Sequence, residues 1–206
     1  MKVYEFKGFP NPARIRIALA EKNLTDAVEF VSVDVPNGEH KSAAFRAKNP
    51  SGLVPALELQ DGTVIAECTA ITEYLDALDG APTLTGSTSK ERAVIHMMQR
   101  RAEADLLDAV ADYFHHATPG LGPDIETNQC AEWGERQKRR ALEGMRYFDT
   151  LLSAQSYVAG DEFSMADITA FAGLIFADFA KIDIPSEYGN LIEWRARVSE
   201  RPSIAA

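Results

Sequence analysis

The chain has 206 residues, of which 46% are hydrophobic and 25% are charged, and its formal net charge is −10. This length and composition are typical of a globular protein with one large domain or two small ones. The acidic excess disfavours general binding to nucleic-acid phosphates or to anionic lipid, so we expect neither nucleic acid nor a membrane among the partners.

The two cysteines, Cys68 and Cys130, lie far apart and match neither a metal-binding nor a redox motif. We therefore expect free thiols in a reducing compartment, without disulfides and without a bound metal. No stretch contains the roughly 18 consecutive apolar residues of a spanning helix, and the first segment lacks the features of a secretory signal. The cytoplasm is therefore the expected location.

The first part of the chain has the pattern of a βαβ unit. Residues 2–6, "KVYEF", form a short run that predicts a strand, and the apolar spacing in residues 13–22, "ARIRIALAEK", predicts a helix. In residues 28–35, "VEFVSVDV", valines alternate with polar residues, which is the period of a strand. A strand, a helix and a second strand of this size favour a right-handed crossover between parallel strands.

A hairpin and a helix are predicted next. The apolar runs at 54–59 and 63–67 are separated by a turn that contains Asp61 and Gly62, and Asp-Gly between such runs is a strong hairpin signal. In "ECTAITEYLDAL" the apolar residues recur at i, i+3, i+4 and i+7, as in an amphipathic helix. The order of elements is thus βαβ followed by ββα.

The second part of the chain is predicted to be helical. A segment rich in Gly, Pro, Ser and Thr follows at residues 79–91, and the later periodicity is almost entirely helical. We expect helices over about 89–116 and 126–153 and shorter ones that start near 165 and 187. The chain then divides into an α/β domain (1–79), a linker (80–88) and an all-helical domain (89–206).

Three motifs stand in a specific order along the chain: "NPSGLVPAL" before the hairpin, "AECTAITEYL" at the start of the third helix, and "VAGDEFSMADI". In the last motif, Ser164 and Asp167 form a variant of the capping box. With these motifs the sequence resembles the cytosolic glutathione S-transferases over essentially its whole length, and especially the fungal and bacterial members that lack the usual catalytic hydroxyl.

The resemblance implies an α/β plus all-α fold, with a thioredoxin-like N-terminal domain of βαβββα type and a helical-bundle C-terminal domain. It also implies a cytoplasmic homodimer that uses glutathione as co-substrate and adds its sulfur to small hydrophobic electrophiles, a detoxification reaction. A non-catalytic interaction module with the same fold is the alternative. A glutathione-dependent disulfide reductase or isomerase is a third interpretation, in which the reductase is disfavoured because the first helix carries no cysteine.

The resemblance also implies a glutathione site. Pro55 would follow a cis bond, and the backbone of Val54 would pair with the cysteinyl part of glutathione. Glu67 and Cys68 would bind the γ-glutamyl end at a helix N-terminus, with a weak side-chain bond because many relatives have Ser or Thr in place of Cys68. From the residues alone, a trans Pro55 that starts an edge strand, and Glu67 and Cys68 as helix start and packing, remain alternatives.

Two basic residues after the second strand, His40 and Lys41, stand where the family often binds the glycyl carboxylate. Solvated loop charges are the alternative interpretation. A helix that forms the dimer interface in relatives carries Arg100, Arg101, Glu103 and Asp105. An acidic residue there, Asp105, would reach the glutathione bound to the partner subunit.

The catalytic position departs from the family pattern. Phe9 stands where relatives have serine and Asn11 where others have cysteine, and Tyr4 lies too early to match the catalytic tyrosine. We hypothesise that amides at the start of the first helix and Asn11 activate the glutathione thiol. A helix cap is the alternative role of Asn11.

A second group of candidates lies in "FHHATPG". His116 and Thr118 would hold a water that helps to activate the thiol, although His115 and His116 also suit the negative end of a helix. The electrophile would lie in a cleft between the domains, in contact with Phe9, Tyr113, Phe114 and Thr118. Aromatic residues on such helices are also common in the core.

Overall fold

The computed structural model describes residues 1–205, and these residues divide into two units, Met1–Leu84 and Thr85–Ala205. The first unit contains β1 (Lys2–Glu5), α1 (Pro10–Glu21), β2 (Glu29–Ser32), α2 (Ala43–Arg46), β3 (Ala56–Glu58), β4 (Val64–Ala66) and α3 (Cys68–Ala77). The strands form one sheet in the order β2-β1-β3-β4. β1 pairs with β2 in parallel, and β3 is antiparallel to both β1 and β4. This arrangement confirms the predicted βαβ and ββα pieces.

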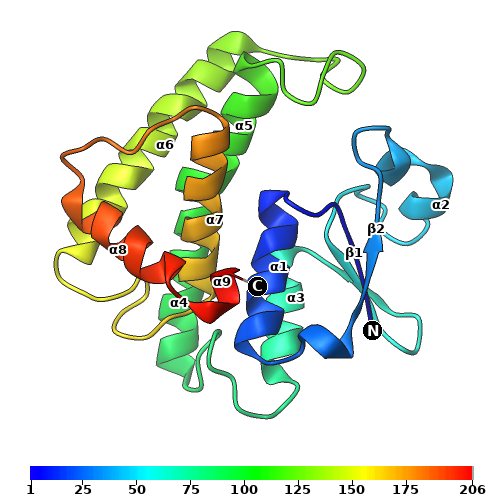
Figure 1. The fold of residues 1–206 in the computed structure, drawn as a ribbon, viewed down its shortest axis with the longest axis horizontal. Helices are drawn as coiled ribbons and strands as arrows, with labels where there is room; N and C mark the ends of the chain where they lie inside the picture. Colours follow the sequence, from blue (N-terminus) through cyan, green and yellow to red (C-terminus); the bar gives the residue numbers. More distant parts are fainter. Residues whose placement is uncertain (206) are drawn as a thin grey trace. The chain divides into compact units, whose positions relative to one another are not determined.

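The alternation of side chains along β1 divides the first unit into two layers around the sheet. Val3 and Leu57 point to the face where buried residues of α1 and α3 pack, with Ile15 and Leu75 fully enclosed. Figure 1 shows these two helices side by side. Tyr4 points to the opposite face and packs with other buried residues (Val33, Phe45 and Ala56), so α2 lies on that side.

Two features of the first unit differ from the prediction. The strand predicted over 28–35 ends at Ser32, because the Val35 amide turns back to the Val33 carbonyl oxygen instead of continuing the ladder. The polar stretch after β2 also contains α2, a single turn for which Ser42 accepts a hydrogen bond from the Phe45 amide. A helix this short leaves little periodic signal in the sequence.

The second unit is helical throughout its regular structure. It contains α4 (Ser89–Ala102), a π-helical turn (Glu103–Leu107), α5 (Asp108–Ala117), α6 (Ala131–Leu152), α7 (Met165–Phe179), α8 (Gly189–Ser199) and α9 (Pro202–Ala205). All four predicted helices are present, but the first one is interrupted by the π turn. The capping box of Ser164 and Asp167 at the start of α7 is confirmed. Thr88 and Glu91 form a second one at α4.

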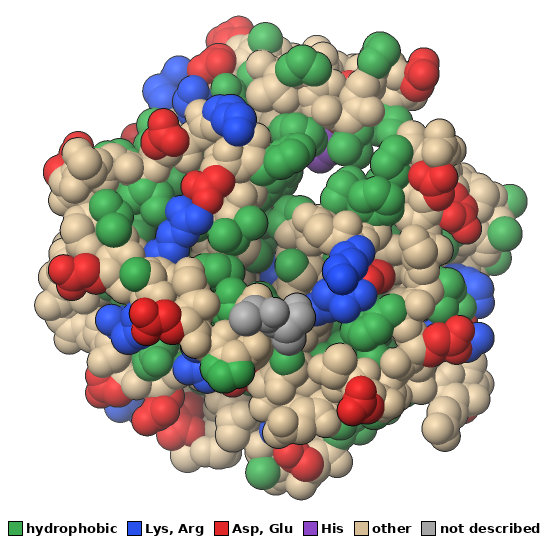
Figure 2. All heavy atoms as spheres, viewed as in Figure 1, with side chains coloured by type: hydrophobic (Ala, Val, Ile, Leu, Met, Phe, Trp, Pro, Cys, Tyr) green, Lys and Arg blue, Asp and Glu red, His purple; other side chains and the backbone are tan. Residues whose placement is uncertain are grey.

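The surface carries charged side chains of both signs. Figure 2 shows acidic and basic side chains intermixed on the face in view. Within residues 1–205, no helix has the length and apolar character needed to cross a membrane. Both cysteines are free thiols; Cys68 is buried and Cys130 is exposed.

Candidate functional site

The N-terminus of α1 offers few backbone donors. The helix follows Phe9 as N-cap, which makes no side-chain capping bond, and its first three residues are Pro10, Asn11 and Pro12. Proline has no N–H, and the amide of Ala13 already donates to the Phe9 carbonyl. Asn11 therefore has the only backbone N–H among the first three helical positions. The predicted role of helix-terminal amides therefore depends on this one N–H, and the alternative that Asn11 is the N-cap is wrong.

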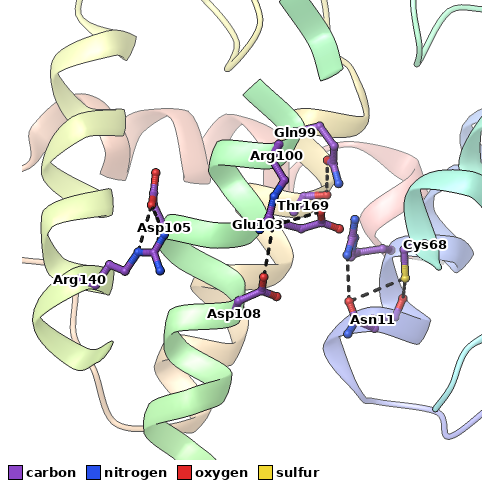
Figure 3. A network of polar contacts seen from close by, with 10 residues as sticks. Asn11, Cys68, Gln99, Arg100, Glu103, Asp105, Asp108, Arg140 and Thr169 are labelled. Carbon is purple, nitrogen blue, oxygen red and sulfur yellow. Dashed lines mark hydrogen bonds and ion pairs between the residues drawn. The ribbon is translucent and has the colours of Figure 1, made fainter. Parts of the chain in front are cut away.

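The side chain of Asn11 links the N-termini of α1 and α3. Its Oδ1 accepts a hydrogen bond from Arg14 Nη1 at 2.9 Å. The thiol of Cys68, the first residue of α3, lies 3.5 Å from the Asn11 carbonyl oxygen and 3.7 Å from Oδ1 (Figure 3). Two helix ends with positive partial charge thus adjoin at one place. Arg14 was missed by the sequence analysis, although its spacing of three residues from Asn11 places it on the same helix face.

The N-terminus of α3 has an unusual backbone. Glu67, its N-cap, has φ 68° and ψ 121°, a conformation that side-chain-bearing residues rarely adopt. The Ile71 amide donates to the Glu67 carbonyl, so the amides of the first turn before it have no acceptor within the helix. Such a group of amides can bind a carboxylate. The sequence contains no glycine or asparagine at this position that would have indicated a positive φ.

The loop before β3 presents backbone that lies outside the sheet. The Val54–Pro55 peptide bond is cis, as the resemblance implied, so the alternative of a trans Pro55 is wrong. The ladder of β3 starts at Ala56, which leaves the backbone of Val54 beyond the paired strand. This backbone is placed to pair with an extended peptide.

Basic residues surround the segment just before Val54. Lys41 Nζ donates to the Gly52 carbonyl oxygen at 3.1 Å. Gly52 has φ +60°, and a Cβ there would lie 2.8 Å from the His40 carbonyl oxygen, so only glycine allows this close approach. Arg46, which the sequence analysis missed, also lies beside Gly52.

The two predicted basic residues differ in character. His40 is only 6% exposed, and its Nδ1 is buried without a hydrogen-bond partner among the described residues. Burial lowers the pKa of His40, and the nearby charges of Lys41 and Arg46 lower it further, so His40 is neutral at pH 7. Burial also lowers the pKa of Lys41, with a smaller effect of Arg46. A carboxylate at this place would therefore meet the cations of Lys41 and Arg46 rather than an imidazolium.

The candidates in the helical unit have partners around the end of α5. His116 Nδ1 accepts a hydrogen bond from the Cys130 amide at 3.0 Å, and His115 Nδ1 lies 2.7 Å from Glu126 Oε1. Thr118 Oγ1 donates to the Phe114 carbonyl oxygen at 2.6 Å. Both histidines thus occupy the last turn of α5, as expected for the negative end of a helix.

The remaining candidates also have defined surroundings. Asp105 lies in the π turn, and its Oδ1 accepts two hydrogen bonds from Arg140, at 3.1 and 2.9 Å (Figure 3). The ring of Tyr113 lies beneath Lys138 Nζ at 4.9 Å, and Phe9 packs edge-on against Phe6. The hydroxyl of Tyr4 donates to Glu58 Oε2 at 2.7 Å within the first unit.

The first unit has a thioredoxin-like fold, and the second is an all-helical domain. A sequence model described as "Glutathione S-transferase, N-terminal domain" matches residues 10–78, and one described as "Glutathione S-transferase, C-terminal domain" matches residues 131–197. The chain is 60% identical to glutathione S-transferase 2 of Saccharomyces cerevisiae over 99% of its own length and 88% of that protein.

Two solved structures have nearly the same fold. The crystal structure of Gtt2 from Saccharomyces cerevisiae is 60% identical and has a TM-score of 0.98, with 100% of this chain and 99% of that chain covered. A glutathione S-transferase domain-containing protein from Marinobacter aquaeolei is also 60% identical, with a TM-score of 0.97 and coverage of 99% and 100%. The chain therefore belongs to the glutathione S-transferase family.

Proposed function

We propose that this chain binds glutathione in its first unit, lowers the pKa of the glutathione thiol and adds the thiolate to small hydrophobic electrophiles. The chain is a glutathione transferase, and glutathione is its co-substrate. The observation that carries the mechanism is the contact between Asn11 and Cys68, which joins the N-termini of α1 and α3. Both helix ends stabilise negative charge, so one can hold the thiolate and the other a carboxylate.

The glutathione molecule would bind by three of its parts. The backbone of Val54, next to Pro55, pairs with the cysteinyl residue. Glu67 binds the γ-glutamyl ammonium, while the Cys68 amide binds the γ-glutamyl carboxylate. Lys41 and Arg46 bind the glycyl carboxylate, and neutral His40 supports their loop. The observed positions of these residues around the β3 loop and the α3 N-terminus support this assignment.

The reacting sulfur would meet Asn11 in place of the usual hydroxyl. The backbone N–H and the side-chain amide of Asn11 stabilise the thiolate. A water bound by His116 and Thr118 contributes a further hydrogen bond. Phe9, Tyr113 and Thr118 contact the electrophile. Asp105 acts toward the glutathione of the partner subunit in a homodimer.

Membership in the family supports the wider setting of this activity. We place the enzyme in the cytoplasm, as a homodimer that detoxifies electrophiles. Its glutathione-binding domain comprises residues 1–79, its helical domain residues 89–206, and residues 80–88 link the two; residue 206 lies outside the described residues.

Calorimetry of glutathione binding in buffers of different ionisation enthalpy tests this function, because it counts the protons released on binding between pH 6 and 8.5. We expect binding with proton release near neutral pH. Binding without proton release would contradict thiol activation. The absence of binding would favour the non-catalytic interaction module.

A further inference from the structure

The side-chain amide of Asn11 can have only one orientation in this structure. Arg14 Nη1 lies 2.9 Å from one terminal atom of that amide. A guanidinium group has donors and no acceptor, so the atom that it contacts must be the carbonyl oxygen Oδ1. The identity of the two terminal atoms, which is often ambiguous for asparagine, is thus fixed by chemistry.

A second, weaker donor lies near the same oxygen and near the main-chain oxygen of Asn11. The Cys68 thiol, a weak donor, lies 3.7 Å from Asn11 Oδ1 and 3.5 Å from the Asn11 carbonyl oxygen (Figure 3). Cys68 is 7% exposed and packs in the core cluster with Ile71 and Leu75. Its sulfur is therefore held firmly in place, and it restrains the Asn11 side chain from the side of α3.

These contacts determine which group of Asn11 remains for a ligand. Asn11 is exposed, and within residues 1–205 its Nδ2 makes no hydrogen bond. Pro10 and Pro12 remove the neighbouring backbone donors, so the amide nitrogen and the N–H of Asn11 are the donors that remain at this helix end. A freely rotating amide would also present Oδ1, whose partial negative charge repels an anion.

We propose that Arg14 and Cys68 are positioning residues that keep Oδ1 of Asn11 engaged and direct its Nδ2 hydrogens at the glutathione sulfur. The proposal rests on the function above, in which the N-terminus of α1 receives the thiolate. The bond from the Arg14 cation also polarises the Asn11 amide, which strengthens Nδ2 as a donor. The thiol of Cys68 would thus position the Asn11 side chain, in addition to the role of Cys68 in glutathione binding.

The test is the pKa of the thiol of enzyme-bound glutathione, measured by thiolate absorbance at saturating glutathione, with the Kd measured separately. Cys68→Ser keeps a side-chain donor near Oδ1, so it should raise the thiol pKa less than Cys68→Ala does. Cys68→Ala should raise it by about half a unit to one unit, which is a roughly 3- to 10-fold loss of thiolate below the pKa. Cys130→Ser, at the other free cysteine, is the matched control and should change neither value.

The Asn11→Ala background separates positioning from a direct effect. If Cys68 acts through Asn11, Cys68→Ala should cause no further rise in the thiol pKa once Asn11 is alanine. An equal rise in both backgrounds would overturn the proposal, as would an unchanged pKa in Cys68→Ala alone. If wild-type enzyme itself leaves the thiol pKa at the ~8.5 of a free thiol, the proposed function fails instead.

Arg14→Met provides a second line of evidence, with Arg14→Lys as the conservative variant that retains a donor. Arg14→Met should raise the pKa of the glutathione thiol. Arg14→Lys should keep this pKa close to the wild-type value. An unchanged thiol pKa in folded Arg14→Met would remove Arg14 from the positioning role. Because Arg14 is only 4% exposed, circular dichroism must show that each Arg14 variant is folded. If one is not folded, the comparison of Cys68→Ser with Cys68→Ala decides whether Asn11 is positioned in this way.

Discussion

Asp167 is a buried carboxylate that joins three parts of the helical unit. Its Oδ1 accepts hydrogen bonds from the Val158 amide at 2.8 Å and from Trp194 Nε1 at 3.1 Å. Its Oδ2 accepts from both the amide and the hydroxyl of Ser164, each at 3.0 Å. Burial raises the pKa of Asp167 to about 6, and the hydrogen bonds from Val158, Trp194 and Ser164 limit this rise. The loop before α7 and the helix α8 are thus fixed to one titrating residue.

The pH dependence of stability tests this residue. Asp167 binds its proton more tightly in the folded protein than in the unfolded chain, where the pKa of an aspartate is about 3.9. The protonated side chain therefore contributes fully to the free energy of unfolding below about pH 4. This contribution is lost as the pH rises to about 6, a change of roughly 3 kcal/mol. We expect urea unfolding to show that the free-energy gap between wild type and Asp167→Asn narrows between pH 4 and 6.5. A gap that widens over this range would mean that the hydrogen bonds outweigh burial.

At the scale of elements, α6 packs unusually close to the π turn between α4 and α5. A Cβ on Gly144 of α6 would lie 2.3 Å from the carbonyl oxygen of Asp105 and 2.9 Å from its carbonyl carbon. Both atoms belong to backbone, which cannot move aside as a flexible side chain can. The ion pair of Asp105 with Arg140 of α6 lies at the same contact. The π turn and the glycine therefore fit each other.

Gly144→Ala should destabilise the protein by about 1–3 kcal/mol or more, because the added methyl group forces α6 away from the π turn. Gly189→Ala is the matched control, since a Cβ there meets nothing within 4 Å. Its stability should stay equal or rise by up to about 1 kcal/mol, as for other exposed helical glycines. Thermal unfolding of the two variants provides the comparison. Equal stabilities would show that α6 adjusts easily and that the close contact is not important.

Element prediction succeeded where the apolar spacing was regular. The spacing in α1, α3 and the later helices predicted their type, and Asp61-Gly62 predicted the hairpin of β3 and β4. The π turn was missed because Glu103–Leu107 is too short to show a period of its own between two helical segments. The end of β2 was misplaced because Val33 and Val35 are both buried although the chain leaves the sheet between them.

For the molecule as a whole, the family resemblance predicted more of the site residues than the residue patterns alone did. It placed Val54, Pro55, Glu67 and Cys68 in one domain, and the structure gives them a cis bond and a helix N-terminus. Spacing along the chain could not show that Arg14 and Cys68 share the Asn11 oxygen, because residues 11 and 68 meet only through packing of α1 against α3. Spacing also could not show that Pro10 and Pro12 leave one backbone donor at the start of α1. That conclusion depends on the position of the N-cap, Phe9, which only the structure gives.

We propose that this enzyme makes a glutathione thiolate without a tyrosine, serine or cysteine at the catalytic position. The most direct test is a pH titration of thiolate absorbance for glutathione bound to the wild-type enzyme. The account predicts a midpoint near neutral pH, at least about one unit below the ~8.5 of a free thiol. A midpoint equal to that of free glutathione, with binding established by calorimetry, would contradict it.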